Sequence, residues 1–92
     1  MEISLNKAAE LSRLMTGSTL SDSAIIKQVE STSDQIKQLS SMEIDSLARK
    51  HNMPFDKGFP QMKMDFSLIA AKYSLDPATL FWIYMDWLKE RQ

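Results

Sequence analysis

The chain has 92 residues and contains no cysteine and one histidine, His51. Disulfide scaffolds, thiolate nucleophiles and cysteine-based zinc sites are therefore excluded, and no pair of histidines exists to hold a metal. Glycine and proline occur only twice and three times, and the sequence has no glycine-rich phosphate-binding loop or calcium loop. No nucleophile or orienting carboxylate is recognisable beside His51. We therefore expect no enzymatic activity, no cofactor, no metal and no small-molecule substrate.

Long apolar runs are also lacking. No stretch approaches the roughly 18 consecutive apolar residues that a membrane-spanning helix needs, and the first residues lack the basic and apolar parts of a signal peptide. The composition, 43% hydrophobic and 25% charged, is typical of a globular protein, and the length suits one compact domain over residues 1–92. We expect a cytoplasmic protein of a single domain that does not contact membranes.

A large excess of one charge is absent too, since the formal net charge is −1. The charges are nevertheless segregated. Residues 1–48 hold four basic and seven acidic side chains, and residues 64–92 hold three basic and four acidic ones. Between them, residues 49–63 hold four basic side chains and one acidic one, which makes the middle of the chain its only basic segment. The cations of this segment are Arg49, Lys50, Lys57 and Lys63.

Two aromatic residues, Phe55 and Phe59, alternate with the cations of the basic segment. Cations beside aromatic rings are typical of sites that bind phosphates and stack on exposed bases. The same side chains would also suit an acidic protein partner. In the other interpretation, the two rings pack into the protein and the lysines are simply solvated.

Apolar residues recur at helical spacing along the chain, and no segment shows the apolar and polar alternation typical of a strand. The sequence therefore predicts an all-α fold, a small bundle of about five helices. Ser4 and Gly17 are placed to cap the two ends of the first helix. Ser21 is placed to cap the second, which either continues over residues 22–39 or breaks near Ser31.

Ser40 and Glu43 form a capping-box pattern, which predicts that a third helix begins there. This helix must end near Asn52, because Pro54 disfavours helical geometry in the residue before it. We interpret residues 53–64 as a structured loop, since this stretch holds two of the three prolines and one of the two glycines.

A fourth helix is predicted to begin at Asp65 and to bury Leu68. The strongest local signal in the sequence follows it, with Asp76 as the cap and Pro77 at the first helical position. We expect the last helix to begin at Pro77 and to end within a few residues of Gln92.

The predicted last helix has a wide apolar surface, because eight of the nine residues from Leu80 to Leu88 are apolar or aromatic. The main apolar arc covers about 200° at 3.6 residues per turn, whereas a surface helix on one core needs about 100°. In one interpretation this is the central helix of the fold. In the other, part of it faces the core while Phe81, Trp82 and Met85 face a protein partner, since Trp, Phe and Met suit binding interfaces.

Residues 66–88 loosely resemble a helix-turn-helix unit, with a turn at Ser74 and a second helix that includes Thr79 in its first turn. Such a unit reads DNA through Arg, Lys, Asn or Gln in the early turns of its second helix. Here those turns offer Phe81 and Trp82 instead. We expect the pair of helices, but the sequence does not favour DNA reading by the second one.

The sequence favours a non-catalytic protein-binding module, such as an adaptor, an assembly chaperone or an inhibitor. Self-association through the last helix, giving a homo-oligomer, is a form of the same hypothesis. The alternative is a nucleic-acid-binding protein that uses either the helix-turn-helix-like end or the basic loop. The residues expected to contact a protein partner are Phe81, Trp82, Met85, Phe55, Lys57 and Phe59. The residues expected to contact phosphates or an acidic partner are Arg49, Lys50 and Lys63.

Overall fold

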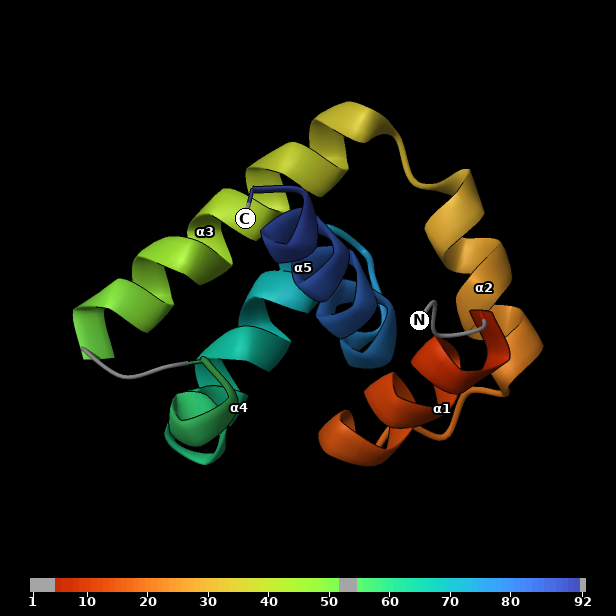
Figure 1. Cartoon of the computed structure of the whole chain (residues 1–92), viewed down its shortest axis with the longest axis horizontal. Helices are drawn as coiled ribbons and strands as arrows, with labels where there is room; N and C mark the ends of the chain where they lie inside the picture. Colours follow the sequence, from red (N-terminus) through yellow and green to blue (C-terminus); the bar gives the residue numbers. More distant parts are fainter. Residues whose placement is uncertain (1–4, 52–54, 92) are drawn as a thin grey trace.

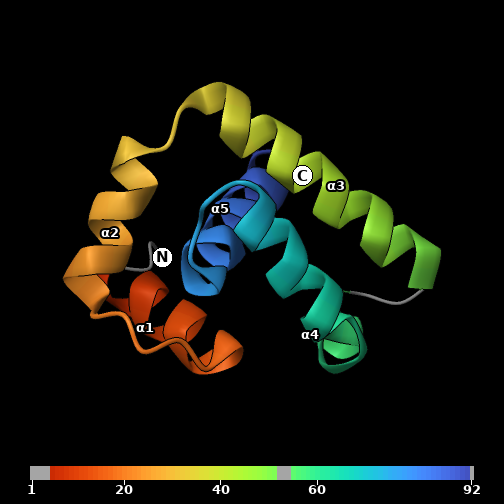
Figure 2. The same cartoon turned by 180° about the vertical axis from the view of Figure 1, so that it is seen from behind.

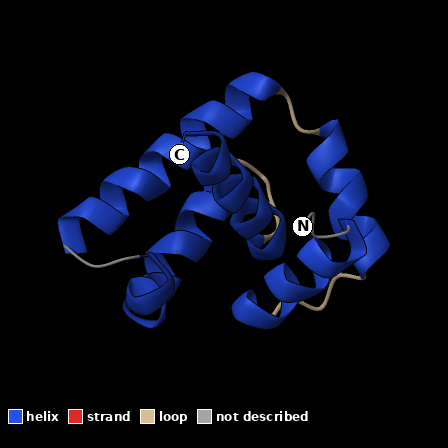
Figure 3. Ribbon diagram, in the orientation of Figure 1, coloured by secondary structure: helices blue, strands red, loops and turns tan. Residues whose placement is uncertain are grey.

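The computed structural model describes residues 5–51 and 55–91, and this part of the chain contains five α-helices. In chain order they are α1 (Leu5–Thr16), α2 (Asp22–Ser31), α3 (Asp34–His51), α4 (Phe55–Lys72) and α5 (Pro77–Arg91) (Figure 1). These residues contain no strand, and short connections join the helices (Figure 3). The prediction of an all-α bundle is confirmed. Within the described ranges, no helix combines the length and the apolar character needed to cross a bilayer.

Helix α5 is the centre of the fold. It packs against each of the other four helices, and Figures 1 and 2 show it between α1 and α2 on one side and α3 and α4 on the other. Two buried clusters meet on it, the larger with α3 and α4 and the smaller with α1 and α2. The fully buried members of these clusters are Ile44, Met62, Phe66, Ala70, Leu80, Ala9, Ile25 and Ala78. The interpretation of the last helix as the central one is confirmed, which explains its wide apolar surface.

Local capping signals set several helix ends as predicted. The Ser21 hydroxyl accepts a hydrogen bond from the Ala24 N–H at 3.2 Å, so Ser21 is the N-cap of α2. The Asp76 carboxylate accepts one from the Ala78 N–H at 2.9 Å and caps α5, which begins at Pro77. At the end of α1, Gly17 adopts a φ of 70°, the left-handed conformation that glycine enters without steric cost.

The chain breaks between α2 and α3, so the continuous helix over residues 22–39 is wrong and the alternative with a break is confirmed. Thr32 is extended, and Ser33 caps α3 by accepting a hydrogen bond from the Ile36 N–H at 3.2 Å. The predicted helix start at Ser40 is wrong as well. Ser40 lies buried within α3, where its hydroxyl donates to the Ile36 carbonyl at 2.7 Å instead of capping a new helix.

The loop predicted for residues 53–64 is wrong from Phe55 onward, because α4 begins at Phe55 and not at Asp65. Residues 53 and 54 lie outside the described part of the chain. Pro60 is inside α4, although it has no N–H to donate to the preceding turn. Figures 1 and 2 show the first turns of α4 at an angle to the rest, which is the expected effect of a proline on helix direction.

Side-chain burial explains why α4 extends past its proline. Met62, Phe66 and Ala70 follow one another at four-residue spacing and are all fully buried, which places one apolar stripe of α4 in the core. Burying a Met or Phe side chain contributes about 1.5–3 kcal/mol, enough to offset much of the cost of an interior proline. Leu68 lies off this stripe and is 64% exposed, so the prediction that it is buried is wrong.

A tight turn at residues 73–76 joins α4 to α5. The Leu75 N–H donates to the Ala70 carbonyl at 2.8 Å and the Ser74 N–H to the Ala71 carbonyl at 3.0 Å. With Ser74 at a φ of 57°, this is the Schellman pattern of hydrogen bonds that ends a helix. The expected helix-turn-helix-like pair at the C-terminal end is present, with its second helix in the core.

Candidate protein-binding groove

The three residues of α5 that we expected to face a partner divide between core and surface. Phe81 is buried, with 7% of its surface exposed, and its ring meets the Phe66 ring edge-on at a centroid distance of 6.3 Å. Met85 is 38% exposed and Trp82 is partly exposed. Phe81 is therefore placed to stabilise the core, and the exposed part of the expected surface reduces to Trp82 and Met85.

Trp82 lines a groove of about 540 Å³ between α5 and the junction of α2 with α3. The Trp82 side chain is partly buried, packs against the small core cluster around Ile25 and also lines the groove. We call this feature the tryptophan groove, and its lining residues are Val29, Asp34, Lys37, Gln38, Trp82, Ile83, Asp86, Trp87 and Glu90. It contains both tryptophans of the chain.

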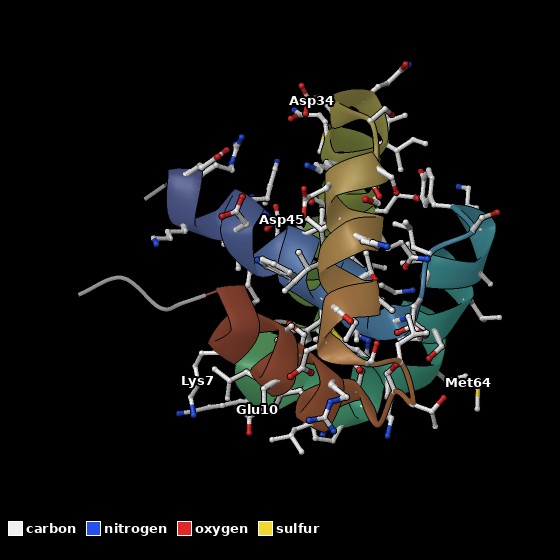
Figure 4. All side chains as sticks on the ribbon, turned by 90° about the vertical axis from the view of Figure 1, so that its right-hand side faces the viewer. Lys7, Glu10, Asp34, Asp45 and Met64 are labelled. Carbon is white, nitrogen blue, oxygen red and sulfur yellow. The ribbon has the colours of Figure 1, made fainter. Side chains whose placement is uncertain are left out.

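One wall of the tryptophan groove is a regular stripe along α5. Trp82, Asp86 and Glu90 follow one another at four-residue spacing, which places them on the same helix face. The opposite wall comes from the end of α2 and the beginning of α3, where Asp34 lies (Figure 4). The groove therefore depends on the break between these two helices, which turns α3 across the end of α5.

Trp87 is held rigidly at the edge of the groove. Its indole stacks on the Tyr84 ring at a centroid distance of 5.9 Å, with 21° between the planes. The Arg91 guanidinium lies 4.5 Å from the centre of the Trp87 ring, within the range of a cation–π interaction. Trp87 thus presents a fixed aromatic surface.

A polar contact between α3 and α5 involves Tyr84, the residue on which Trp87 stacks. The Tyr84 hydroxyl donates to the Asp45 carboxylate at 3.4 Å, and the Arg49 guanidinium donates to the other oxygen of Asp45 at 2.9 Å. Burial, and after it the negative charge of Asp45, raises the pKa of the Tyr84 hydroxyl to about 12. The hydroxyl is therefore a neutral donor at physiological pH.

The basic segment forms no single surface with the tryptophan groove. Arg49 and Lys50 are exposed at the end of α3, and Lys57 is exposed near the beginning of α4. Lys63 lies elsewhere, since a side-chain carbon added to Gly17 would be 3.9 Å from the Lys63 ammonium nitrogen. The cations expected to act together are therefore divided between two places. The side chains of Phe55 and Phe59, also expected to contact a partner, lie outside the described part of the structure.

The early turns of α5, the second helix of the helix-turn-helix-like pair, are largely buried. Ala78, Thr79 and Phe81 in the early turns of α5 are buried against the other helices, whereas a recognition helix must present these turns to the major groove. These three side chains of α5 therefore face the interior of the fold.

A second, more open hollow lies between α3 and α4, and the sequence pattern did not indicate it. Its volume is about 520 Å³, and its lining residues are Leu39, Met42, Glu43, Ser46, Leu47, Ile69 and Tyr73. Lys72 donates a 2.7 Å hydrogen bond to Glu43 at its edge, which lowers the pKa of the Glu43 carboxyl. The sequence did not predict this hollow, because its walls form only if α3 continues through Ser40 and α4 lies beside α3.

Among the side chains that the structure describes, no group of three or more His, Asp or Glu residues is arranged to hold a metal ion. Comparisons with protein-family models, with curated proteins and with solved structures found no match for this chain.

Proposed function

We propose that this protein is a non-catalytic protein-binding module, acting as an adaptor, an assembly chaperone or an inhibitor, and that the tryptophan groove is its binding site. The observation that carries the proposal is the placement of Trp82 and Trp87 in one groove, while the other two aromatic side chains of α5, Phe81 and Tyr84, are in the core. Tryptophan is among the residues that contribute most to binding energy at protein interfaces. A cytoplasmic location remains part of the proposal.

The geometry of the groove suits a segment of another protein. Its walls come from rigid helices, so little conformational freedom is lost when a partner binds. Apolar surface from Val29 and Trp82 lies beside the polar groups of Asp34 and Gln38. This mixture of apolar and polar groups is typical of pockets that orient a bound group.

The test is retention of a partner from an extract of the source cells by immobilised wild-type and variant protein. We expect a protein that the wild type retains and that Trp82→Ala loses. Met64→Ala is the matched control, because Met64 is 78% exposed and projects outward from α4 (Figure 4). Retention of the same proteins by the wild type and by Trp82→Ala would contradict the proposal.

Trp82 also packs against the Ile25 cluster, so its truncation lowers stability through lost burial. Thermal unfolding of each variant therefore accompanies the extract experiment. Asp86→Ala serves as a second groove variant, because Asp86 is exposed and its truncation removes no core contact. Loss of the same partner with Asp86→Ala assigns the effect to the groove and not to unfolding.

Nucleic-acid binding by the basic end of the molecule is the second candidate. Its support is the exposure of Arg49, Lys50 and Lys57 near the connection between α3 and α4. Phosphate binding is strongest at low salt, so retention on heparin or single-stranded DNA at about 50 mM salt is the test. Absence of retention rejects this candidate, and salt-sensitive retention that Lys50→Gln weakens would favour it.

A further inference from the structure

The tryptophan groove carries an excess of negative charge. Its lining includes the carboxylates of Asp34, Asp86 and Glu90 and a single ammonium group, that of Lys37. None of these three carboxylates takes part in an ion pair between described residues, all of which lie elsewhere on the molecule. Their charges are therefore available to a ligand instead of being neutralised within the fold.

The negative charges lie next to Trp82, which is partly exposed. Asp86 follows Trp82 by one turn of α5, so a cation placed over the Trp82 ring also lies within reach of this carboxylate. Trp87 already makes such a contact within the protein, because the Arg91 guanidinium lies over its ring. Among the described residues, no cation lies over Trp82 in this way.

From this charge complementarity, we infer that the occupant of the tryptophan groove is a cationic segment of a separate protein, with lysine or arginine side chains interleaved with apolar ones. A basic side chain lies over Trp82 and pairs with Asp86, a second one pairs with Glu90 one turn further along α5, and an apolar side chain contacts Val29. The inference rests on the proposed function and adds the chemistry of the partner to it.

The experiment titrates the full chain with three synthetic peptides of about 14 residues. All three place leucine at the same positions, and the remaining positions are lysine in the first, glutamine in the second and glutamate in the third. Both tryptophans of the chain line the groove, so a change in their fluorescence reports occupancy of this site. We expect saturable binding of the lysine peptide, weaker binding of the glutamine peptide and none of the glutamate peptide.

Two double variants separate the groove from the charge of the whole protein. Asp86→Asn with Glu90→Gln removes two charges from the groove. Glu10→Gln with Asp65→Asn removes two charges elsewhere, that of the exposed Asp65 and that of the partly exposed Glu10, which pairs with Lys7 at 3.9 Å. We expect the groove variant to bind the lysine peptide about three- to tenfold more weakly, a range typical of two exposed ion pairs. The control variant should change the affinity less than twofold.

Several results would overturn the inference. Equal weakening by the two double variants would show general attraction to an acidic surface, and equal binding of the lysine and glutamine peptides would show that charge does not select the occupant. Equal binding of the lysine and glutamine peptides, or no binding of any peptide, would reject the cationic partner. The proposed function would not be rejected by these results, because the extract experiment tests it separately. A chain that self-associates at micromolar concentration in sedimentation, and loses this with the groove variant, would make a second copy the occupant.

Discussion

The Tyr84 hydroxyl on α5 donates a hydrogen bond to the Asp45 carboxylate on α3 across 3.4 Å. Tyr84 is 1% exposed, and its ring stacks on Trp87 at the edge of the tryptophan groove. The contact therefore connects the central helix, the α3 wall and the candidate binding site. Because the Tyr84 hydroxyl can ionise, this contact predicts that the stability of the fold depends on pH.

The folded-state pKa of Tyr84, raised to about 12 by burial, lies above the value of about 10 for an unfolded chain. The neutral hydroxyl thus stabilises the fold fully below pH 10, and this contribution is lost as pH rises toward 12. We expect the free energy of unfolding to fall by up to about 1.4 kcal/mol per pH unit in this window. Denaturant unfolding of wild type and Tyr84→Phe from pH 8 to 12 measures the effect. Parallel pH profiles for the two proteins would contradict it.

Two adjacent buried serines on α3 differ in their hydrogen bonds. The Ser40 hydroxyl donates to the Ile36 carbonyl, whereas the Ser41 hydroxyl is buried without a hydrogen-bond partner. Because an unsatisfied buried hydroxyl costs about 1–3 kcal/mol, we expect Ser41→Ala to be more stable than Ser40→Ala by about 1–2 kcal/mol. Chemical unfolding of both variants tests this, and their shared helical context cancels the effect of alanine on helix propensity. An equal change in both would be evidence against it.

The extension of α4 through Pro60 predicts opposite behaviour for two of its apolar residues. Phe66 is fully buried against Phe81, whereas Leu68 is 64% exposed. We expect Phe66→Ala to lower the free energy of unfolding by about 3–5 kcal/mol and Leu68→Ala to change it by less than about 0.5 kcal/mol. Thermal or denaturant unfolding distinguishes the two. A large loss of stability with Leu68→Ala would show that the helix presents a different face to the core.

Helix ends with a short-range cause were predictable from sequence. Ser21, Gly17 and the pair Asp76 and Pro77 each act through groups within a few residues, and the structure has all of these helix ends where they were predicted. At Ser40 the same local pattern failed. A serine followed three residues later by glutamate forms a capping box only if the chain is not already helical, and the helix that Ser33 starts continues through Ser40.

Features that depend on tertiary packing were not predictable. Pro60 indicated a loop by its local chemistry, whereas the buried stripe of Met62 and Phe66 favours a helix. The apolar arc of α5 was recognised, but the burial of Phe81 depends on how α4 packs against it, and the partial exposure of Trp82 on how α1 and α2 pack. The four-residue spacing of Trp82, Asp86 and Glu90 is visible in the sequence. The opposite wall of the groove was not predictable, because it forms only where the chain breaks before α3.

The central claim is that a protein partner covers Trp82 in the tryptophan groove. Acrylamide quenching of the Trp87→Phe variant, in which Trp82 is the only tryptophan, tests this most directly once the partner from the extract experiment is in hand. We predict that Trp82 is readily quenched in the free protein, because it is partly exposed, and becomes protected when the partner is added to saturation. Unchanged quenching in the saturated complex would contradict the claim.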